Sequence, residues 1–525
     1  MNAPLPFNFK YERLTIGSLH EDMTIDVHAQ DASTFSEFIF QAADHAYRLA
    51  WVFGTDDRMI TKTFGVHAVL IPRESQFPTL LVRVALPEDT PQYPSLTRKL
   101  IAANWYERYM SDMFGIIPEG HPDPRRLVHH ENVPRGVHPL RKDFAWNTRM
   151  QYAHEPYPMQ KVEGEGVYQI PVGPIHAGII EPGHFRFSVV GERILNLESK
   201  LFFTHKGVEK LLEGKSPEEA MPYIERISDD SAVGHALTFS LAIESLTRAR
   251  VPQRAAYLRV LLAELERLTM HIHDIANIAG MGAGYTIMAA QGFRIKEELV
   301  RLSDRVFQNR FWRGYVCIGG VARDLSISEI EDIRTTVKKV MDDMRALLHI
   351  GLESDGLIER MANSGVLKQD AALAYGAVGV AARAARIPWD VRIDRPYAAY
   401  KNMDVVAATK SAGDVYARFM VRAAEIEVSA RLITHSLDAI RNTPEAVRIP
   451  VTLSPGESYA SVEGWRGEIL HFLRLNLDGT IDRAAFRDPS FANWPLFGEL
   501  APGNIVPDFP LCNKSLNLSY SGTDL

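Results

Sequence analysis

Cysteine is almost absent from this chain of 525 residues, which contains only Cys317 and Cys512. Two thiols so far apart support neither a disulfide framework nor a structural zinc site, and both fit a reducing compartment. Cys317 lies in a small apolar segment in which packing is the expected role. The sequence therefore assigns no chemistry to either cysteine.

Long apolar runs and an excess of positive charge are lacking as well. No segment approaches the roughly eighteen apolar residues that cross a bilayer, and the N-terminus lacks a charged start followed by an apolar core. The net charge is −7, so no basic field exists of the kind that nucleic-acid binding needs. We expect a cytoplasmic protein with no transmembrane segment of its own and no nucleic-acid partner.

The first part of the chain, residues 1–145, has the pattern of a small α+β domain. Short apolar, β-branched runs predict strands at 65–72 and 78–86. Helical spacing predicts covering helices within 34–52 and 95–113. Residues 146–166 are polar, with prolines and glycines and little periodicity, which is typical of an inter-domain linker.

The second part, residues 167–525, changes from strands to helices and back. Short strands are expected in 168–201, with a turn at Gly191-Glu192, and again in 451–477. Helical periodicity predicts a central bundle with helices in 253–278, 294–311, 328–348, 368–384 and 413–442. In the first of these, the apolar residues share one side, and Arg259, Glu264 and Glu266 lie largely elsewhere. The last stretch contains several prolines and is expected to be irregular, so the fold class is α+β with a helical bundle and peripheral short strands.

Several motifs of the first domain together resemble the 30-kilodalton subunit of respiratory complex I. They are Asn104-Trp105-Tyr106-Glu107-Arg108, Asp112-Met113-Phe114-Gly115, Gly120-His121-Pro122-Asp123-Pro124 and His138-Pro139-Leu140-Arg141. The rest of the chain resembles the 49-kilodalton subunit of complex I and, equally, the large subunit of the group 4 [NiFe] hydrogenases, which include hydrogenase-4 and formate hydrogenlyase. That resemblance is carried by Gly173-Pro174-Ile175-His176, Glu181-Pro182-Gly183-His184, His205-Lys206-Gly207-Val208, Arg259 to His271 and Trp389 to Tyr397.

Two further segments correspond to the metal-binding motifs of the hydrogenase branch. In those relatives a central and a C-terminal Cys-x-x-Cys pair hold nickel and iron. Here the four ligand positions are Ser228, Ser231, Ser519 and Gly522. A serine hydroxyl stays protonated near neutral pH and is a hard ligand, whereas these metals require thiolates, and glycine has no side-chain ligand. We therefore expect the hydrogenase-like scaffold without a nickel–iron centre and no metal bound by this chain.

The resemblance also implies how a quinone would be bound. In complex I relatives, a histidine and a tyrosine hydrogen-bond the quinone head group. The histidine is present as His176, but the tyrosine position is occupied by Asp229. An aspartate there could accept hydrogen bonds or relay protons instead. A role of His176 in loop capping stays open.

The resemblance gathers a group of acidic and basic residues into one polar cavity. It comprises Asp229, Asp230, His235, Asp390, Arg392 and Asp394. Carboxylates crowded in one cavity have raised pKa values and can pass protons at neutral pH. The alternative is that Asp229 and Asp230 only cap a helix that begins near Ser231.

Other residues match relay or cluster-facing positions of the relatives. Glu181 matches the region of a proton-transfer glutamate, and His205 is a candidate for the same relay. Arg226 begins the central motif, and His271 matches a histidine beside the terminal iron–sulfur cluster of a neighbouring subunit. For both histidines, a structural role as a satisfied core side chain is equally open.

The function implied by the resemblance is that of a large subunit in a membrane-associated complex I-like or hydrogenase-4-like oxidoreductase. Electrons would arrive from a [4Fe-4S] cluster on a partner small subunit and would reduce a quinone or another acceptor with protonation. Antiporter-like and other membrane subunits are the further partners, at the cytoplasmic face of the inner membrane. The chain has no nucleotide-binding motif, so NAD would act only through other subunits. The alternatives are a non-catalytic coupling scaffold and, more weakly, a hydrogenase.

Overall fold

The structure is a computed structural model that describes residues 13–19, 23–176, 181–444 and 446–525. Its N-terminal part is a five-stranded sheet in the order β1-β2-β5-β4-β3, in which β2 and β5 are parallel and the other neighbours antiparallel. The strands are β1 (Leu14–Leu19), β2 (Thr24–Ala29), β3 (Tyr47–Asp56), β4 (Thr63–Pro72) and β5 (Thr79–Pro87). The predicted strands at 65–72 and 78–86 are therefore confirmed.

Strand β3 lies at the edge of this sheet, yet all ten of its residues are buried. It packs against β15 (Ile481–Arg487) and α3 (Asn104–Phe114), which cover the edge. An edge strand that is covered in this way offers no free hydrogen-bonding groups to another chain. The N-terminal sheet and the C-terminal strands therefore share one core.

The helix predicted over 34–52 is wrong in its second half. Helix α1 (Ala32–His45) is capped by Asp31, and the chain then turns into β3 at Tyr47. The β-branched and aromatic residues after Tyr47 fit a strand that is buried on both faces. The helix predicted over 95–113 is likewise shorter, because two 3₁₀ turns at Leu96–Arg98 and Ile101–Ala103 precede α3.

The long connection between the two parts carries little regular structure. After β6 (Gln92–Pro94), α3 and β7 (Ile117–Glu119), residues 120–166 contain no helix or strand. A three-stranded antiparallel sheet follows, with β8 (Val167–His176), β9 (Gly183–Val190) and β10 (Arg193–Lys200) in the order β10-β9-β8. The predicted turn at Gly191-Glu192 joins β9 to β10. The division into domains at 145 and 167 stays a prediction.

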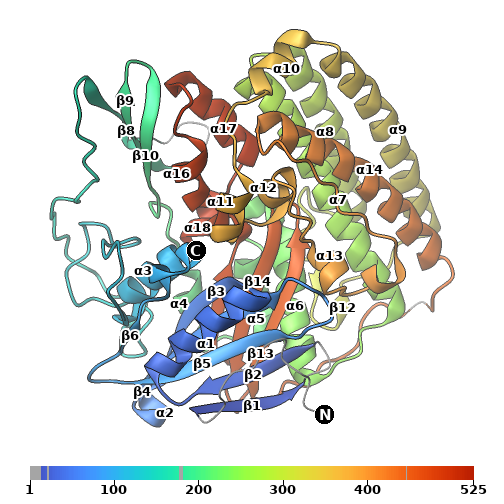
Figure 1. Cartoon of the computed structure of the whole chain (residues 1–525). Coiled ribbons are helices and arrows are strands. Elements are labelled where there is room, and N and C mark those ends of the chain that lie inside the picture. Colours follow the sequence, from blue (N-terminus) through green and yellow to red (C-terminus); the bar gives the residue numbers. More distant parts are fainter. Residues whose placement is uncertain (1–12, 20–22, 177–180, 445) are drawn as a thin grey trace.

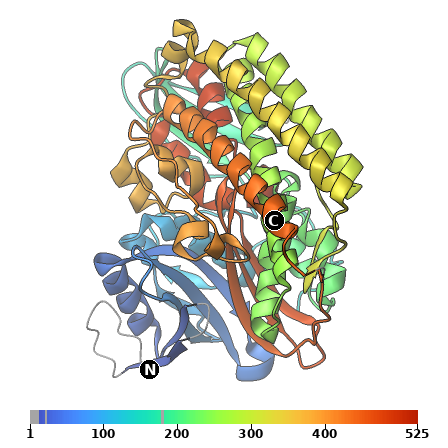
Figure 2. The same cartoon turned by 90° about the vertical axis from the view of Figure 1, so that its right-hand side faces the viewer.

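Long helices from the middle of the chain lie together on one side of the molecule (Figure 1). They are α6 (Ala232–Thr247), α7 (Gln253–Asn277), α8 (Thr286–Phe307), α9 (Ile327–Leu352) and α14 (Val415–Ile440). Figure 2 shows α8, α9 and α14 running side by side on one flank. The short elements β11 (Val316–Cys317), β12 (Gly320–Val321), α10 (Asp355–Met361) and α13 (Val391–Asp394) lie between the long helices along the chain. Earlier in the chain, α2 (Arg58–Thr61) joins β3 to β4, and α4 (Val208–Leu211) and α5 (Pro217–Ile224) lie between β10 and α6.

Helix α7 is enclosed on all sides, and this corrects the predicted amphipathic arrangement. Arg259, Glu264 and Glu266 are buried, although the periodicity placed them away from the apolar side. Helices α6, α8 and α14 pack around α7 and leave no solvated face. Buried charges must be paired, and Arg259 accordingly makes a two-pronged ion pair with Glu244.

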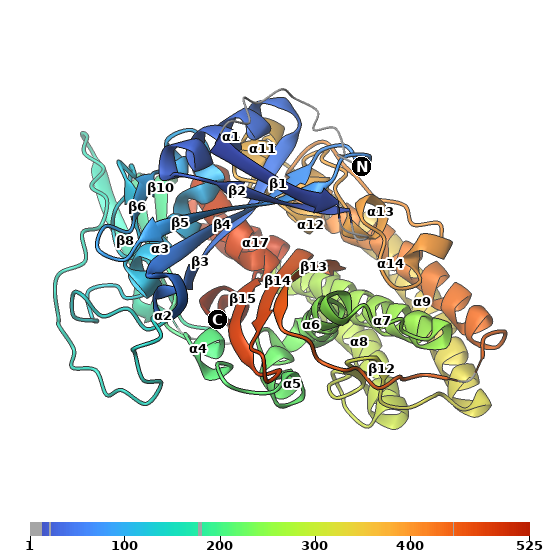
Figure 3. The ribbon, with the colours of Figure 1, turned by 90° about the horizontal axis from the view of Figure 1, so that it is seen from below.

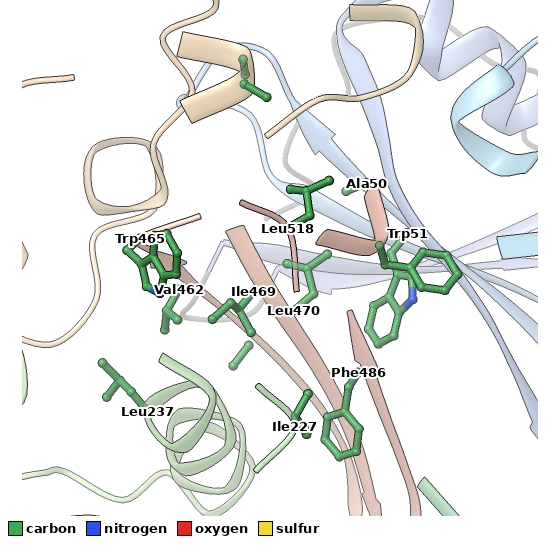
Figure 4. Packing of buried hydrophobic residues seen from close by; sticks show 14 of the residues in the cluster. Ala50, Trp51, Ile227, Leu237, Val462, Trp465, Ile469, Leu470, Phe486 and Leu518 are labelled. Carbon is green, nitrogen blue, oxygen red and sulfur yellow. The ribbon is translucent and has the colours of Figure 1, made fainter. Parts of the chain in front are cut away.

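The C-terminal strands β13 (Gly456–Gly464), β14 (Gly467–Leu475) and β15 form an antiparallel sheet. In Figure 3 they lie between the N-terminal sheet and helices α6 and α7. Figure 4 shows how the core continues across them, with Trp51 of β3 on one side and Leu237 of α6 on the other. Leu470 and Ile469 of β14 lie between these two side chains. The sheet is thus the wall that both parts of the chain share.

Two predictions for the later part of the chain need correction. The single helix expected over 368–384 is two short helices, α11 (Gln369–Ala374) and α12 (Gly379–Ala384), because Gly376 takes a φ of 68° and ends the first. The stretch expected to be irregular contains α15 (Pro489–Asn493), α16 (Phe497–Leu500), α17 (Phe509–Leu516) and α18 (Tyr520–Asp524). Its prolines start helices rather than prevent them, as in α15 and α17.

The fold class is α+β, as predicted, with a helical bundle and short strands around it. Among the helices of the described residues, none is both long and apolar enough to cross a membrane.

Candidate functional site

The central and the C-terminal motif meet inside the molecule. The hydroxyls of Ser228 and Ser519, 291 positions apart in the sequence, are hydrogen-bonded at 2.9 Å. The Ser519 hydroxyl also accepts a bond from the Gly522 backbone N–H at 2.8 Å and so caps α18. Both serines are buried. We call Ser228, Ser231, Ser519 and Gly522, with Asp230, Arg466 and Asp488, the serine cluster.

An ion pair stands beside these serines. Both Nη atoms of Arg466 lie 2.6 Å from the carboxylate oxygens of Asp230, and the guanidinium stacks on the Trp465 ring at 3.9 Å. Burial alone would raise the pKa of Asp230, but the ion pair outweighs burial and holds that pKa below its usual value. The Ser228 hydroxyl donates to the same carboxylate at 2.9 Å. The polar groups of this cluster therefore satisfy one another.

The fourth ligand position is blocked by a carboxylate. A Cβ atom added to Gly522 would lie 2.7 Å from Cγ of Asp488. Asp488 is held in place by His235, whose Nε2 is 3.1 Å from its Oδ2, and His235 contacts Nε2 of His471 through Nδ1 at 3.0 Å. Burial would raise the pKa of Asp488, but the bond to His235 lowers it below the usual value. Burial also holds the pKa of His471 well below its usual value.

These side chains do not fit the thiolate set that the resemblance associates with nickel and iron. The four ligand positions offer three serine hydroxyls and, at Gly522, only backbone atoms. The Arg466 guanidinium lies among them and adds a positive charge. In the described residues there is no group of three or more His, Cys, Asp or Glu side chains that could hold a metal ion. Both cysteines are free.

Glu181 and His205 lie against the C-terminal segment. The Glu181 carboxylate accepts a bond from the Ser521 backbone N–H at 2.8 Å, and His205 Nδ1 contacts the backbone carbonyl of Asp524. Asp524 accepts bonds from Phe202 N and Thr204 N, and burial raises its pKa to about 6. Both predicted relay residues are thus brought next to the serine cluster, where they also anchor the end of the chain.

The prediction that Asp229 lies in the cavity is wrong. Its side chain is 70% exposed and pairs with Arg313 at 2.7 Å. A 3₁₀ turn at Asp229–Ser231 directs neighbouring residues to different sides, so the half-buried Asp230 faces Arg466 and Asp229 points outward. Arg226 is also exposed and donates to the Pro222 carbonyl, so it does not enter the cluster either.

The alternative in which the aspartates cap helix α6 is wrong as well. Ser231 is the N-cap residue, and no side-chain bond caps the helix there. Glu266 of α7 instead accepts bonds from the backbone N–H groups of Val233 and Gly234, at 2.7 and 3.1 Å. Burial raises the pKa of Glu266 to about 8 despite these two bonds.

Asp390, Arg392 and Asp394 belong to a second group, and no hydrogen bond or ion pair among the described residues joins them to Asp230. Arg392 pairs with Asp390 at 2.7 Å and with Glu264 at 2.9 Å. His271 is fully buried and lies 2.7 Å from Glu425, and burial lowers its pKa to about 4 although this contact raises it. We call Glu264, Arg267, Arg383, Asp390, Arg392, Glu425 and Glu463 the arginine network.

His176 ends strand β8, where it pairs with Gly183 of β9. Its side chain lies outside the described residues, so its predicted role toward a quinone stays a prediction.

Sequence reasoning missed the residues that complete both groups. Arg466 sits at the β13–β14 turn, and Asp488 precedes α15. Glu463, like Arg466, interrupts a strand pattern that is otherwise apolar and small, Val462-Glu463-Gly464-Trp465-Arg466-Gly467. Charged residues within an otherwise apolar hairpin indicate that they have buried partners, because buried charges must be paired. This pattern could have identified Glu463 and Arg466 from the sequence.

Comparisons with known proteins agree with this architecture. Residues 25–150 match the family described as the 30 kd subunit of respiratory-chain NADH dehydrogenase, and residues 282–452 and 445–525 match its 49 kd subunit. The chain is similar to hydrogenase-4 component G of Escherichia coli, with 30% identity over 96% of this chain and 88% of that protein. It is similar to formate hydrogenlyase subunit 5 of the same organism, with 29% identity over 91% of this chain and 84% of that protein.

The C/D subunit of NADH-quinone oxidoreductase from Edwardsiella ictaluri is 28% identical over 90% of this chain and 87% of that protein. These relatives are named as components or subunits, so each is part of a larger assembly. The chain therefore belongs to the family of complex I-like oxidoreductase subunits in which a 30-kilodalton-type and a 49-kilodalton-type part are fused, together with the hydrogenase-4 and formate hydrogenlyase components.

Proposed function

We propose that this chain is the large subunit of a complex I-like or hydrogenase-4-like assembly that works without a nickel–iron centre. It receives electrons from a [4Fe-4S] cluster on a partner small subunit and couples their arrival to protonation and to the reduction of a quinone or another acceptor. The observation that carries this proposal is the serine cluster, in which the four ligand positions hold no thiol and Arg466 pairs with Asp230.

Partners and location follow from the same proposal. The chain binds a cluster-bearing small subunit and, with it, antiporter-like and other membrane subunits at the cytoplasmic face of the inner membrane. It holds no cofactor itself, and NAD, where it is used, acts on other subunits. The named assemblies of the relatives support this arrangement.

A second candidate is a non-catalytic coupling scaffold, and one observation favours it. The position of the second quinone contact is Asp229, which faces solvent and pairs with Arg313. A cavity with only one of the two contacts binds a quinone head group less well. In a scaffold the buried groups would change protonation without turning over a substrate.

The purified complex decides between these functions. Reduction of a quinone analogue by the complex, with an artificial electron donor, supports the enzyme, and ion movement without quinone reduction supports the scaffold. Metal analysis of the same preparation is the companion measurement. Stoichiometric nickel in this chain would contradict both the nickel-free enzyme and the scaffold, and it would support a hydrogenase instead.

A further inference from the structure

Arg383 is the centre of the arginine network. It is fully buried, donates from Nη1 to Glu463 at 2.8 Å, and places Nε 2.7 Å from Glu425 and Nη1 3.6 Å from Asp390. These three carboxylates come from β13, α14 and the start of α13. One guanidinium therefore ties together three separate elements.

The network holds more negative than positive groups. Glu264, Asp390, Glu425 and Glu463 face Arg267, Arg383 and Arg392, and each of the seven residues is at most 3% exposed. Arg267 lies 3.4 Å from Glu264 and 3.9 Å from Glu425. An uncompensated charge at such a depth is costly, so the fourth carboxylate is stabilised by binding a proton.

Glu463 is the least compensated of the four. Glu264 receives bonds from Arg392, Tyr400 and Ser429, and Asp390 receives two from the Arg392 guanidinium and one from the Arg392 backbone. Glu425 contacts His271 and lies 2.7 Å from Arg383 and 3.9 Å from Arg267. Among the described residues, Glu463 has one cation within 4 Å, Arg383, and one further bond of 3.1 Å from the Val391 backbone N–H, whereas each of the other three carboxylates has two cations within 4 Å.

The titration behaviour of the four carboxyls agrees with this ranking. Burial, with Asp390 adding to it, raises the pKa of Glu463 to about 7 against the opposing effect of Arg383 and Arg267. For Glu264, Asp390 and Glu425, burial is outweighed by the facing cations, and their pKa values lie below the usual range. Only Glu463 of this group is therefore placed to exchange a proton near neutral pH.

Glu463 also has a route to water. It lines a cavity of about 20 Å³ between the two parts of the chain, a space for about one water molecule. The N-terminal part contributes Arg48 and Thr79, and the other wall contains Asp390, Trp389, Glu468 and the half-buried Asp394. Arg48 pairs with Glu468 at 2.8 Å and so keeps these two wall charges balanced.

We propose that Glu463 binds and releases the single proton that balances the arginine network, and that it exchanges this proton with solvent through the cavity between the two parts of the chain. The proton leaves the Glu463 carboxyl for a cavity water and returns by the same path. In the proposed function this proton would offset the charge of electrons that arrive beside the Glu425–His271 pair, so its use rests on that function. The existence of the proton site at Glu463 does not depend on it.

Infrared spectroscopy of the full chain tests the site. The wild type should show a protonated-carboxyl C=O band that disappears as pH rises from 5 to 9, with a midpoint near 7, and that shifts on transfer to D₂O. Asp524 and Glu266, with pKa values of about 6 and 8, contribute bands of their own in this pH range. The Glu463 band is therefore isolated as the wild-type spectrum minus that of Glu463→Gln, and the variant should lack this component and keep the other two. The matched control is Glu457→Gln on the same strand, which is part-exposed and pairs with Arg83 and Arg474, and it should keep the band unchanged.

A carboxyl band near neutral pH that is the same in Glu463→Gln as in the wild type overturns the proposal, as does the absence of any such band in the wild type. If Glu463→Gln does not fold, Glu463→Asp keeps an acid at the site and should move the midpoint of the band. An unmoved midpoint counts against the proposal.

The assembled complex separates this inference from the proposed function. A complex that reduces no acceptor while the band still titrates refutes the proposed function and leaves the proton site standing. Quinone reduction with the same pH profile in Glu463→Gln and wild type refutes the use of the proton in coupling.

Discussion

The serine cluster and the arginine network are two buried polar groups of the same protein, and they are balanced in different ways. In the serine cluster each polar group has a partner, with hydroxyls bonded to hydroxyls and Asp230 bonded to Arg466. In the arginine network four carboxylates face three guanidinium groups. Each group holds one carboxylate more than it holds guanidinium groups, and the extra carboxylate has different partners. In the serine cluster Asp488 contacts His235 and accepts a bond from the Ser490 backbone N–H, whereas in the arginine network Glu463 contacts Arg383 and accepts a bond from the Val391 backbone N–H. The number of charges in a buried site therefore does not predict its chemistry, whereas the partners of its extra carboxylate do.

The largest effect is expected from Arg383→Met in the arginine network. The change leaves Glu425, Glu463 and Asp390 without their common cation, and breaking a buried ion pair from one side costs about 3–5 kcal/mol. Urea unfolding of the full chain measures it. The matched control is Arg345→Met, which removes an exposed pair with Glu427 that is worth about 0–1 kcal/mol. Equal losses for the two variants would mean that the network does not stabilise the fold.

A smaller loss is expected from Gly522→Ala in the serine cluster. The new methyl group would lie 2.7 Å from Cγ of Asp488, and overpacking of this kind costs about 1–3 kcal/mol. Gly498→Ala is the control, because a Cβ there has no neighbour within 4 Å. A thermal melt in which the two variants unfold alike would show that the Gly522 site has free room.

Glu266, which caps α6 beside the serine cluster, should make the stability of the fold depend on pH. The folded pKa of Glu266 is about 8, above the unfolded value of about 4.3. Its contribution to stability is therefore fully present below about pH 4.3 and is lost as pH rises through about 8. The decline in unfolding free energy between pH 7 and 9 should be smaller in Glu266→Gln than in the wild type. An identical decline would show that Glu266 is ionised in the folded chain.

The smallest effect is expected from cutting the predicted linker, because the two parts of the chain should stay associated after the cut. Lys161 is exposed in a stretch without helix or strand. Across the interface, Arg48 pairs with Glu468, Arg487 donates to the Ala50 carbonyl, and Tyr109 donates to Glu209. Limited trypsin cleavage should leave two fragments that elute together in gel filtration. Separate elution in native buffer would mean that the cavity beside Glu463 depends on the covalent link.

The sequence predicted the elements whose periodicity is undisturbed, such as helix α7 and strands β4 and β5, and it predicted which segments form the serine cluster. It failed at Tyr47, where burial from a distant strand favours β structure, and at Gly376, where one positive φ divides a helix. It could not separate Asp229 from Asp230, because a single 3₁₀ turn sends one outward and the other toward Arg466. Arg466 and Glu463 were missed although their charges in an apolar hairpin marked them, and Asp488 was missed because its partner His235 lies far away along the chain.

The contact between position 522 and Asp488 limits what a single substitution at this position can do. A cysteine that arose at this position by a single mutation would meet the Asp488 carboxylate before it could meet any metal, and His235 fixes that carboxylate. A thiolate site at this position would require Asp488 to change as well, which would remove the contact of His235 with Asp488 and leave its contact with His471. One added thiol is therefore not sufficient to create a metal site here, because the neighbouring carboxylate has to be replaced with it.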